Sequence, residues 1–294
     1  MIKRALYLIK TTLPMLLMMG LCVSVKAQKV NAVQEGSLLA PQKVKIDAKL
    51  DEWGDNLQAY NKTTKLWYTI ANDDKNLYLV IKSTDQINTS KIMGGGVTLT
   101  INTAGKKKEE NAYSITFPIL PRASMRGLRR PRGSNANTVM DSASLAEAAI
   151  ARKQAIAAIK EISVLGFKDI TDTLISIYNE YGIKAAPGYD DKANFQFELA
   201  VPLKLLALSA SSPKEFAYNL KVNGIQFGGG PANRGGGGNG GFAGGGRNGG
   251  GGRNGGGFGG GGFGGGGNFG GGDNGMNEML SPTDFWGKYT LAKK

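Results

Sequence analysis

The feature that most constrains the fold is a run of glycine between residues 228 and 275. Glycine occupies 31 of these 48 positions, and only 14 of the 45 glycines lie elsewhere in the 294-residue chain. Glycine buries no side chain and loses the most backbone entropy on ordering, so this run cannot build a packed core. It predicts a long disordered loop that contains no regular element.

An ordinary foldable segment follows the run at residues 281–291, and it contains Phe285, Trp286 and Tyr289. The entropy cost of closing a loop grows only with the logarithm of its length, so a domain tolerates a long insertion between two of its strands. We therefore expect a surface loop inside a domain, which residues 281–291 complete with a closing strand, rather than a disordered tail.

The first 27 residues have the pattern of a secretory signal peptide. Basic residues open the segment, an apolar stretch follows at 13–23, and Val25 and Ala27 are placed for cleavage after Ala27. The alternatives are an uncleaved anchor, for which the stretch is short, and lipidation at Cys22, where Leu21 replaces the expected small residue. We predict an exported protein, periplasmic, cell-surface or extracellular, which is not transmembrane after cleavage.

The composition excludes several kinds of chemistry. There is no histidine, and the single cysteine, Cys22, lies in the predicted signal. Disulfides, Cys-based zinc sites, Cys nucleophiles and Ser-His-Asp triads are thereby excluded, so catalysis would depend on carboxylates, Lys, Tyr or a bound metal. The net charge of +13, or +9 without the first 27 residues, favours an acidic polymer or an anionic cell surface as partner, or simply serves solubility.

The rest of the chain has the pattern of an all-β protein. Runs of alternating or β-branched residues are separated by turn-forming stretches. The predicted strands are 43–46, 66–71, 77–84, 97–102, 112–117, 174–178, 183–185, 194–201, 216–226 and 287–291. They predict one domain over 43–291, a two-sheet antiparallel β-sandwich of jelly-roll-like type, preceded by an N-terminal extension at 28–42.

An insert at 118–162 interrupts the predicted strands. Its first part is a basic, irregular loop with five arginines that begins at Arg122 and either contacts phosphates or anionic glycans or is simply solvated. Its second part, 142–161, is rich in alanine and predicts one helix. A partner-binding helix is the alternative to a helix that packs on the sandwich through one apolar stripe. That stripe consists of Leu145, Ala149, Ile156 and Ile159.

Five stretches, in order, resemble family 9 carbohydrate-binding modules and their DOMON-like relatives in secreted bacterial proteins. The first, Ile-Asp-Ala-Lys-Leu-Asp-Glu-Trp at 46–53, is similar to an opening in which glycine usually stands where Ala48 does. The others are a hairpin at 66–81, a strand at 95–102, a Glu-x-Ala-x-Pro strand with a helical turn at 197–206, and a closing stretch at 285–289. The resemblance implies a β-sandwich, and it implies sugar binding less specifically because folds carry many functions.

In that family, sugar is held between aromatic rings while polar side chains contact its hydroxyls. The resemblance and the residue types give four candidate ligand-binding residues here: Trp67, Tyr68, Tyr113 and Arg122. Trp67 and Tyr68 are neighbours on a strand and point to opposite faces, so one ring must be less buried than the other. An exposed flat ring could stack on the apolar face of a pyranose.

Other side chains have simpler interpretations. Relatives in the family often bind calcium, and Asp73 and Asp74 are weak candidates, although no spacing matches an EF-hand and the pair most simply caps a turn. No other cofactor is expected. Glu198 could pair with a Lys or Arg inside the sandwich. We expect Trp53 and Trp286 to lie in the core, and the alternative for both is a ring that contacts a ligand.

Three functions remain open. The first is non-catalytic binding of a carbohydrate or another envelope polymer. The second is a structural role, in which the Arg and Phe residues of the glycine run mediate self-association. Such runs also bind nucleic acid, but export argues against that partner. The third is a carboxylate-based glycan hydrolase, for which no carboxylate pair stands out in the sequence.

Overall fold

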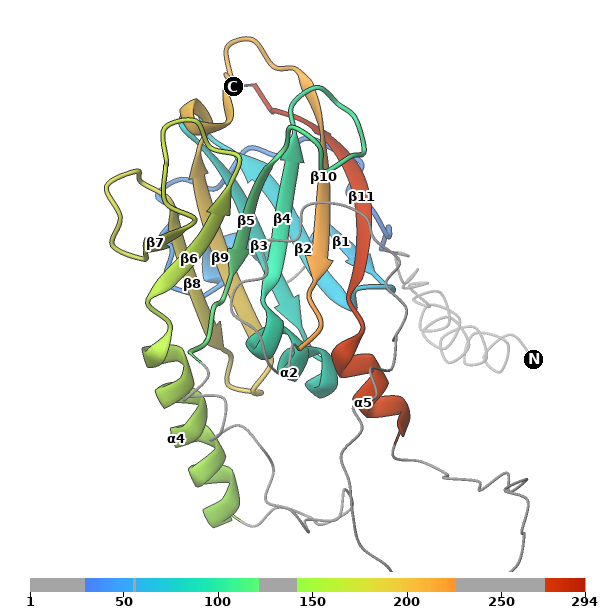
Figure 1. The fold of residues 1–294 in the computed structure, drawn as a ribbon, viewed down its shortest axis with the longest axis vertical. Helices are drawn as coiled ribbons and strands as arrows, with labels where there is room; N and C mark the ends of the chain where they lie inside the picture. The colour runs from blue at the N-terminus through green and yellow to red at the C-terminus, as the bar shows by residue number, and fades with distance from the viewer. Residues whose placement is uncertain (1–29, 55–56, 122–141, 226–272, 294) are drawn as a thin grey trace, which may run out of the picture.

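The computed structural model describes residues 30–54, 57–121, 142–225 and 273–293, which form two antiparallel sheets packed face to face (Figure 1). In spatial order, the five-stranded sheet consists of β1 (Ala59–Asn61), β2 (Leu66–Asn72), β3 (Asn76–Ser83), β9 (Phe195–Pro202) and β8 (Lys184–Tyr189). The six-stranded sheet consists of β11 (Thr283–Thr290), β10 (Glu215–Val222), β4 (Val97–Asn102), β5 (Tyr113–Phe117), β6 (Glu161–Leu165) and β7 (Leu174–Ser176). The predicted all-β sandwich is confirmed.

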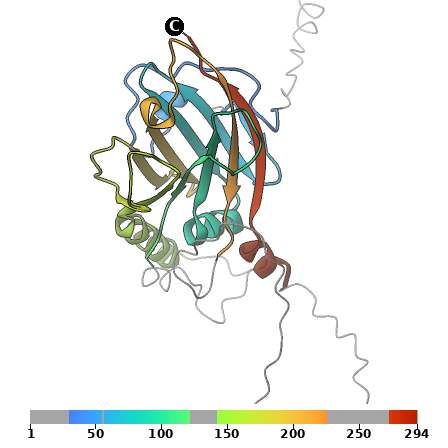
Figure 2. The ribbon, with the colours of Figure 1, turned by 45° about the horizontal axis from the view of Figure 1, so that its top comes forward.

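Three helices lie at one end of the sandwich, below the sheets in Figures 1 and 2. They are α2 (Gln86–Gly95), α4 (Ser142–Ala158) and α5 (Asp273–Leu280). Two short 3-10 turns, η2 (Asp51–Trp53) and η4 (Leu203–Leu206), complete the structure. In the described part of the chain, no helix is both long enough and apolar enough to cross a membrane.

The alternation of side chains explains why the two sheets pack. In β4, Val97, Leu99 and Ile101 belong to the hydrophobic core, while the threonines between them face outward. The two layers meet through aromatic rings: Phe117 of β5 and Phe197 of β9 stack with their centroids 5.5 Å apart. Burial of this apolar surface is the main force that holds the layers together.

The strands on either side of the glycine run pair with each other. Strand β11, which follows the run, pairs with β10, which precedes it, from Glu215 opposite Thr290 to Val222 opposite Thr283. Residues 226–272 lie outside the described residues. Helix α5, however, begins at Asp273, within the stretch that was predicted as loop. That prediction was wrong at its C-terminal end, because only one of the eight residues of α5 is glycine.

Some predicted strand positions are also wrong. Residues 43–46 form no strand, since Lys43 and Ala48 adopt positive φ angles of 62° and 63°, which break an extended run. The edge of the five-stranded sheet is instead β1, which the sequence did not predict. Strand β6 and helix α2 were also not predicted. The helix of the insert is shorter than expected, because α4 ends at Ala158 and the chain enters β6 at Glu161.

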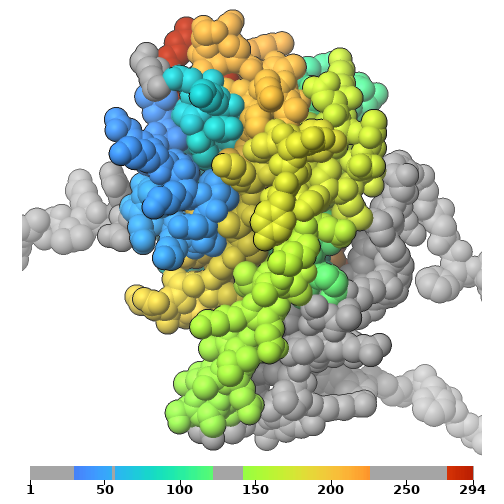
Figure 3. Space-filling view, turned by 90° about the vertical axis from the view of Figure 1, so that its left-hand side faces the viewer, coloured from blue at the N-terminus to red at the C-terminus, as the bar shows by residue number. Residues whose placement is uncertain are grey.

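Helix α4 packs on the sandwich only near its C-terminal end. Ile156 and Ile159 contact the core, and the Arg152 guanidinium lies 5.6 Å from the centre of the Tyr189 ring. Leu145 is 52% exposed, so the expected packing of the whole stripe is wrong. The reason is geometric: the first turns of α4 stand out beyond the ends of the sheets (Figure 3).

The segment before residue 43 is tied to the five-stranded sheet. Asn31 and Leu39 form isolated bridges with Ala59 and Asn72. The Gln34 side chain accepts from the backbone N–H of Ile70 and donates to its carbonyl, both at 2.8 Å. Residues 30–42 therefore form part of the sandwich fold instead of preceding it.

Candidate functional site

The structure does not bring the predicted ligand-binding residues together. Tyr68 is fully buried between the sheets, where its hydroxyl lies 2.9 Å from that of Tyr218. Tyr113 is half-buried and packs inward against Phe167. Trp67 lies on the outer face of the five-stranded sheet. Arg122 lies outside the described residues.

Trp67 is the only one of these residues placed on an outer sheet surface in the described part of the chain. Its ring lies against that of Tyr60, its cross-strand partner, with the centroids 4.7 Å apart. Both rings are half-buried. The two rings thus form a small aromatic surface at the β1 edge of the sandwich.

The outer face of the five-stranded sheet is largely closed next to these rings. Fully buried Glu198 accepts hydrogen bonds from the backbone N–H groups of Asp47 and Ala48, at 3.0 and 2.7 Å, and from the indole N–H of Trp53 at 2.8 Å. Burial raises the pKa of Glu198, and these three donors counteract the increase. The expected Lys or Arg partner was wrong, and half-buried Trp53 lies over the sheet rather than in the core. The Glu198 carboxylate thereby holds the segment at residues 46–53 against the outer face of the five-stranded sheet.

The predicted calcium candidates belong to a turn. The Asp73 carboxylate accepts hydrogen bonds from the backbone N–H groups of Lys75 and Asn76 and from the hydroxyl of Tyr78. Burial alone would raise the pKa of Asp73, but these hydrogen bonds outweigh it and lower the pKa. Across the described residues, no group of three or more acidic side chains gathers as a metal site would require. The Asp73 oxygens therefore hold the turn together.

The outer face of the six-stranded sheet is different, because polar side chains cover it and the helices do not (Figure 1). We call this surface the hydroxyl face. Its central row, read across the sheet, is Trp286 of β11, Asn219 of β10, Thr100 of β4 and Ser114 of β5. The adjacent row is Asp284, Lys221, Thr98, Thr116 and Ser163.

The hydroxyl groups of this face are paired between neighbouring strands. Thr98 and Thr116 lie 2.7 Å apart, and Thr100 and Ser114 lie 3.1 Å apart, measured between their hydroxyl oxygens. Within each pair one hydroxyl donates and the other accepts, so the accepting hydroxyl keeps its own hydrogen for a further acceptor. Asn219 and Thr100 are buried within the central row, at 1% and 3% exposed, whereas Thr98, Ser114 and Thr116 are half-buried. The hydroxyls of these three half-buried residues are therefore the ones that reach the surface.

Trp286 is on this outer face, which corrects the expectation that it lies in the core. The inward residues of β11 are Phe285 and Tyr289, which pack against the core, and Gly287, which lies close to the Tyr218 ring. Trp286 has the opposite orientation and is half-buried. Its indole therefore lies on the outer face, with Asn219 between it and Thr100 in the same row.

Asn219, the cross-strand partner of Trp286, is held in a fixed orientation. Its side-chain N–H donates to the Asp284 carboxylate at 2.7 Å and to the carbonyl of Phe285 at 3.0 Å. Its side-chain oxygen is buried, and none of the described residues donates a hydrogen bond to it. A buried acceptor without a hydrogen-bond donor costs about 1–3 kcal/mol. Such acceptors are rare in folded proteins.

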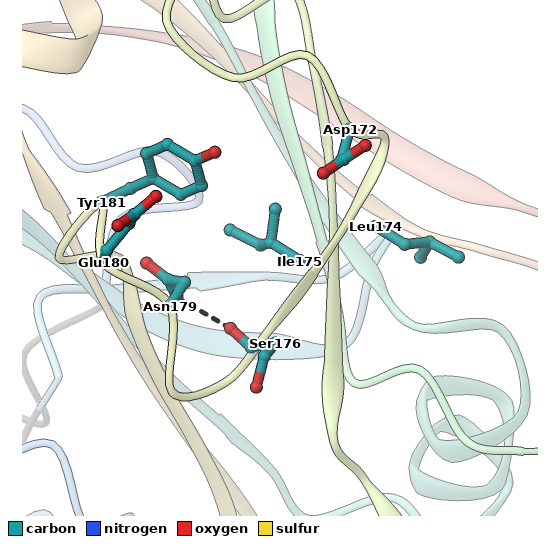
Figure 4. A pocket seen from close by; sticks show the side chains of 7 residues that line it. All are labelled: Asp172, Leu174, Ile175, Ser176, Asn179, Glu180 and Tyr181. Atoms are coloured by element: carbon teal, nitrogen blue, oxygen red, sulfur yellow. Dashed lines mark hydrogen bonds between the residues drawn. The ribbon is translucent and has the colours of Figure 1, made fainter.

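A shallow hollow of about 370 Å³ lies at the far edge of the same sheet, beside β7 (Figure 4). Glu180 and Tyr181 stand on one side of it, Asp172 stands on the other, and Ile175 lies between them. Asn179 shapes the loop, since its amide donates to the carbonyls of Ser176 and Ile183. Sequence reasoning missed this hollow; the signal was the Tyr-Asn-Glu-Tyr stretch at 178–181.

Comparisons with known proteins identify no relative of this chain: no protein-family model matches it, and neither the curated proteins nor the solved structures include a match.

Proposed function

We propose that the protein binds a carbohydrate, or another hydroxyl-rich polymer of the cell envelope, on the hydroxyl face without changing it chemically. The observation that carries this proposal is the position of Trp286, a half-buried indole on an outer sheet surface in the same cross-strand row as the Thr100–Ser114 hydroxyl pair. Aromatic rings that are apolar on their faces and flanked by polar groups suit sugars, which have apolar ring faces and polar edges.

The polar part of the face supplies the complementary contacts. The half-buried Thr98, Thr116 and Ser114 can exchange hydrogen bonds with sugar hydroxyls, because every hydroxyl is both a donor and an acceptor.

The shape of the face favours a polymer over a small molecule. Six strands lie side by side at about 4.8 Å spacing, so the sheet is roughly 24 Å wide. A flat surface of this kind buries little of a single sugar but contacts several units of an extended chain. Lys221 and Asp284 lie on it, so both neutral and charged polymers are candidates.

The test is a glycan array with the protein lacking residues 1–27, followed by titration calorimetry on the best ligand. Trp286→Ala is expected to weaken binding roughly tenfold or more, as truncation of a central aromatic usually does. Trp67→Ala is the matched control, since it removes the same side chain from the other sheet. Binding to no neutral or acidic glycan would overturn the proposal.

Two other outcomes would redirect the assignment. If Trp67→Ala abolishes binding and Trp286→Ala does not, the aromatic surface formed with Tyr60 is the site and the hydroxyl face is not. If reducing ends accumulate when the protein is incubated with its best ligand, the protein cleaves the glycan and is not a simple binding module. Circular dichroism of each variant separates loss of binding from loss of folding.

A further inference from the structure

The hollow beside β7 has the chemistry of a receptor for a cationic side chain. Asp172 and Glu180 face it from opposite sides, and no basic residue is among the side chains that line it (Figure 4). Neither carboxylate forms an ion pair with any of the described residues. Tyr181 adds a half-buried aromatic ring to the lining.

Exposed apolar side chains lie on the strands and the loop near this hollow. Tyr178 is 80% exposed, Leu165 is 58% exposed and Leu174 is 37% exposed. All three belong to strands β6 and β7 or to the loop that follows them. Exposed apolar side chains on the same elements as two carboxylates without an ion-pair partner are typical of a surface that another chain covers.

This chain carries a segment of complementary chemistry. Residues 228–272 contain three arginines and four phenylalanines and no acidic residue. Arginine pairs bidentately with carboxylates and stacks on tyrosine, and phenylalanine packs on exposed aliphatic and aromatic groups. The glycines between them leave the backbone free to bring either side chain onto the surface.

The position of the segment favours a contact between copies. Its two ends are fixed at Ile225 and Asp273, and the 47 residues between them could extend about 75 Å from that base at ~3.3 Å per residue. The run carries three arginines, more than this one hollow can engage, so arginines remain for the hollows of other copies. We propose that the hollow binds an arginine from the glycine run of a second copy, with the guanidinium against Asp172, Glu180 and Tyr181. This contact would link the proteins into assemblies, a role independent of the glycan proposal.

The test is the oligomeric state of the mature protein, measured by sedimentation velocity over a range of concentrations. Association is expected to rise with concentration and to fall with added salt, because salt screens exposed ion pairs. Asp172→Asn combined with Glu180→Gln is expected to weaken association roughly fivefold or more. Glu35→Gln combined with Asp191→Asn is the control, since it removes the same charge from exposed positions elsewhere.

A second measurement identifies the occupant. A synthetic peptide of residues 228–272 is titrated against the protein variant in which those residues are replaced by Gly-Asn-Gly. Binding is expected, and it should weaken when Arg234, Arg247 and Arg253 are replaced by glutamine in the peptide. A monomer at all concentrations, or equal peptide binding by the hollow variant and the control, would overturn the proposal. Glycan binding by the hollow variant reports on the hydroxyl face alone, so the two proposals fail separately.

Discussion

The backbone N–H of Ile225 donates to the carbonyl of Met279 at 2.9 Å, which joins the chain just before residues 226–272 to helix α5, which follows them. The backbone of Gly224 lies very close to the backbone of Leu280 at this junction. A Cβ atom added to Gly224 would lie 1.8 Å from the carbonyl oxygen of Leu280, so no larger residue fits there. The strands that flank the glycine run, β10 and β11, are therefore joined directly in one sheet.

Removing the run is expected to leave the fold intact. Replacement of residues 228–272 by Gly-Asn-Gly should raise the free energy of unfolding by about 1–2 kcal/mol, because a shorter loop costs less entropy to close. Urea unfolding followed by tryptophan fluorescence measures this change. A loss of cooperative unfolding would show that the run contributes to the core, contrary to the position of β11.

Gly287 is expected to be intolerant of any side chain. A Cβ atom there would lie 2.3 Å from the Tyr218 ring, which is fully buried and hydrogen-bonded to Tyr68. Gly287→Ala should lower the free energy of unfolding by about 2–3 kcal/mol, as overpacking of a rigid core does. Gly36→Ala is the control, because nothing lies within 4 Å of its added Cβ. Equal stability of the two variants would contradict the packing described.

Glu198 is expected to hold the opening segment in place. Glu198→Ala leaves the amides of Asp47 and Ala48 and the indole of Trp53 without their acceptor, and it should cost about 3 kcal/mol. Hydrogen exchange measured by NMR should show lost protection at Asp47 and Ala48 and retained protection in β10. Unchanged exchange at these two amides would show that Glu198 does not pin the segment.

Because of Lys91, the free energy of unfolding is expected to change with pH in the alkaline range. Its side chain is 1% exposed, its amine donates to the Thr283 hydroxyl at 3.1 Å, and burial lowers its pKa below 10.5 despite the nearby Glu278 carboxylate. Between the folded-state pKa and 10.5, the unfolded chain binds more protons, so the free energy of unfolding rises with pH across that window.

Lys91→Met should remove this rise and, near neutral pH, increase stability by about 1 kcal/mol, since it replaces a buried charge by an apolar side chain of similar length. Thermal unfolding in a series of buffers up to pH 10.5 measures both effects. Lys62→Met, at an exposed position, is the control and should leave the pH dependence unchanged. A rise that persists in Lys91→Met would assign it to another group.

The sequence predicted which residues form strands better than it predicted which side chains of a strand point into the core. Alternation from Val97 to Asn102 gave a strand with the observed bounds, because alternation depends only on a two-residue period. The same rule could not say which of Phe285 and Trp286 points inward, since both are large and apolar. Gly287 lies against the Tyr218 ring and therefore faces inward, and Phe285, two residues earlier, shares that face. This contact depends on the register between β10 and β11.

The candidate sites depend on contacts that sequence patterns do not contain. Thr98 and Thr116 are 18 positions apart, and they become a pair only once β4 and β5 are in register. Asp172 and Glu180 flank a hollow because the chain turns after β7, which has only three residues. Periodicity identifies strands, but surface sites are set by their pairing and by the loops.

The contact between Ile225 and Met279 and the pairing of β10 with β11 also determine how the protein would respond to proteolysis. A single cut within residues 226–272 would divide the polypeptide into two fragments that stay together, since β11 is held to β10 by eight residue pairs. The closing strand is thus held by its pairing with β10 and not by the continuity of the chain.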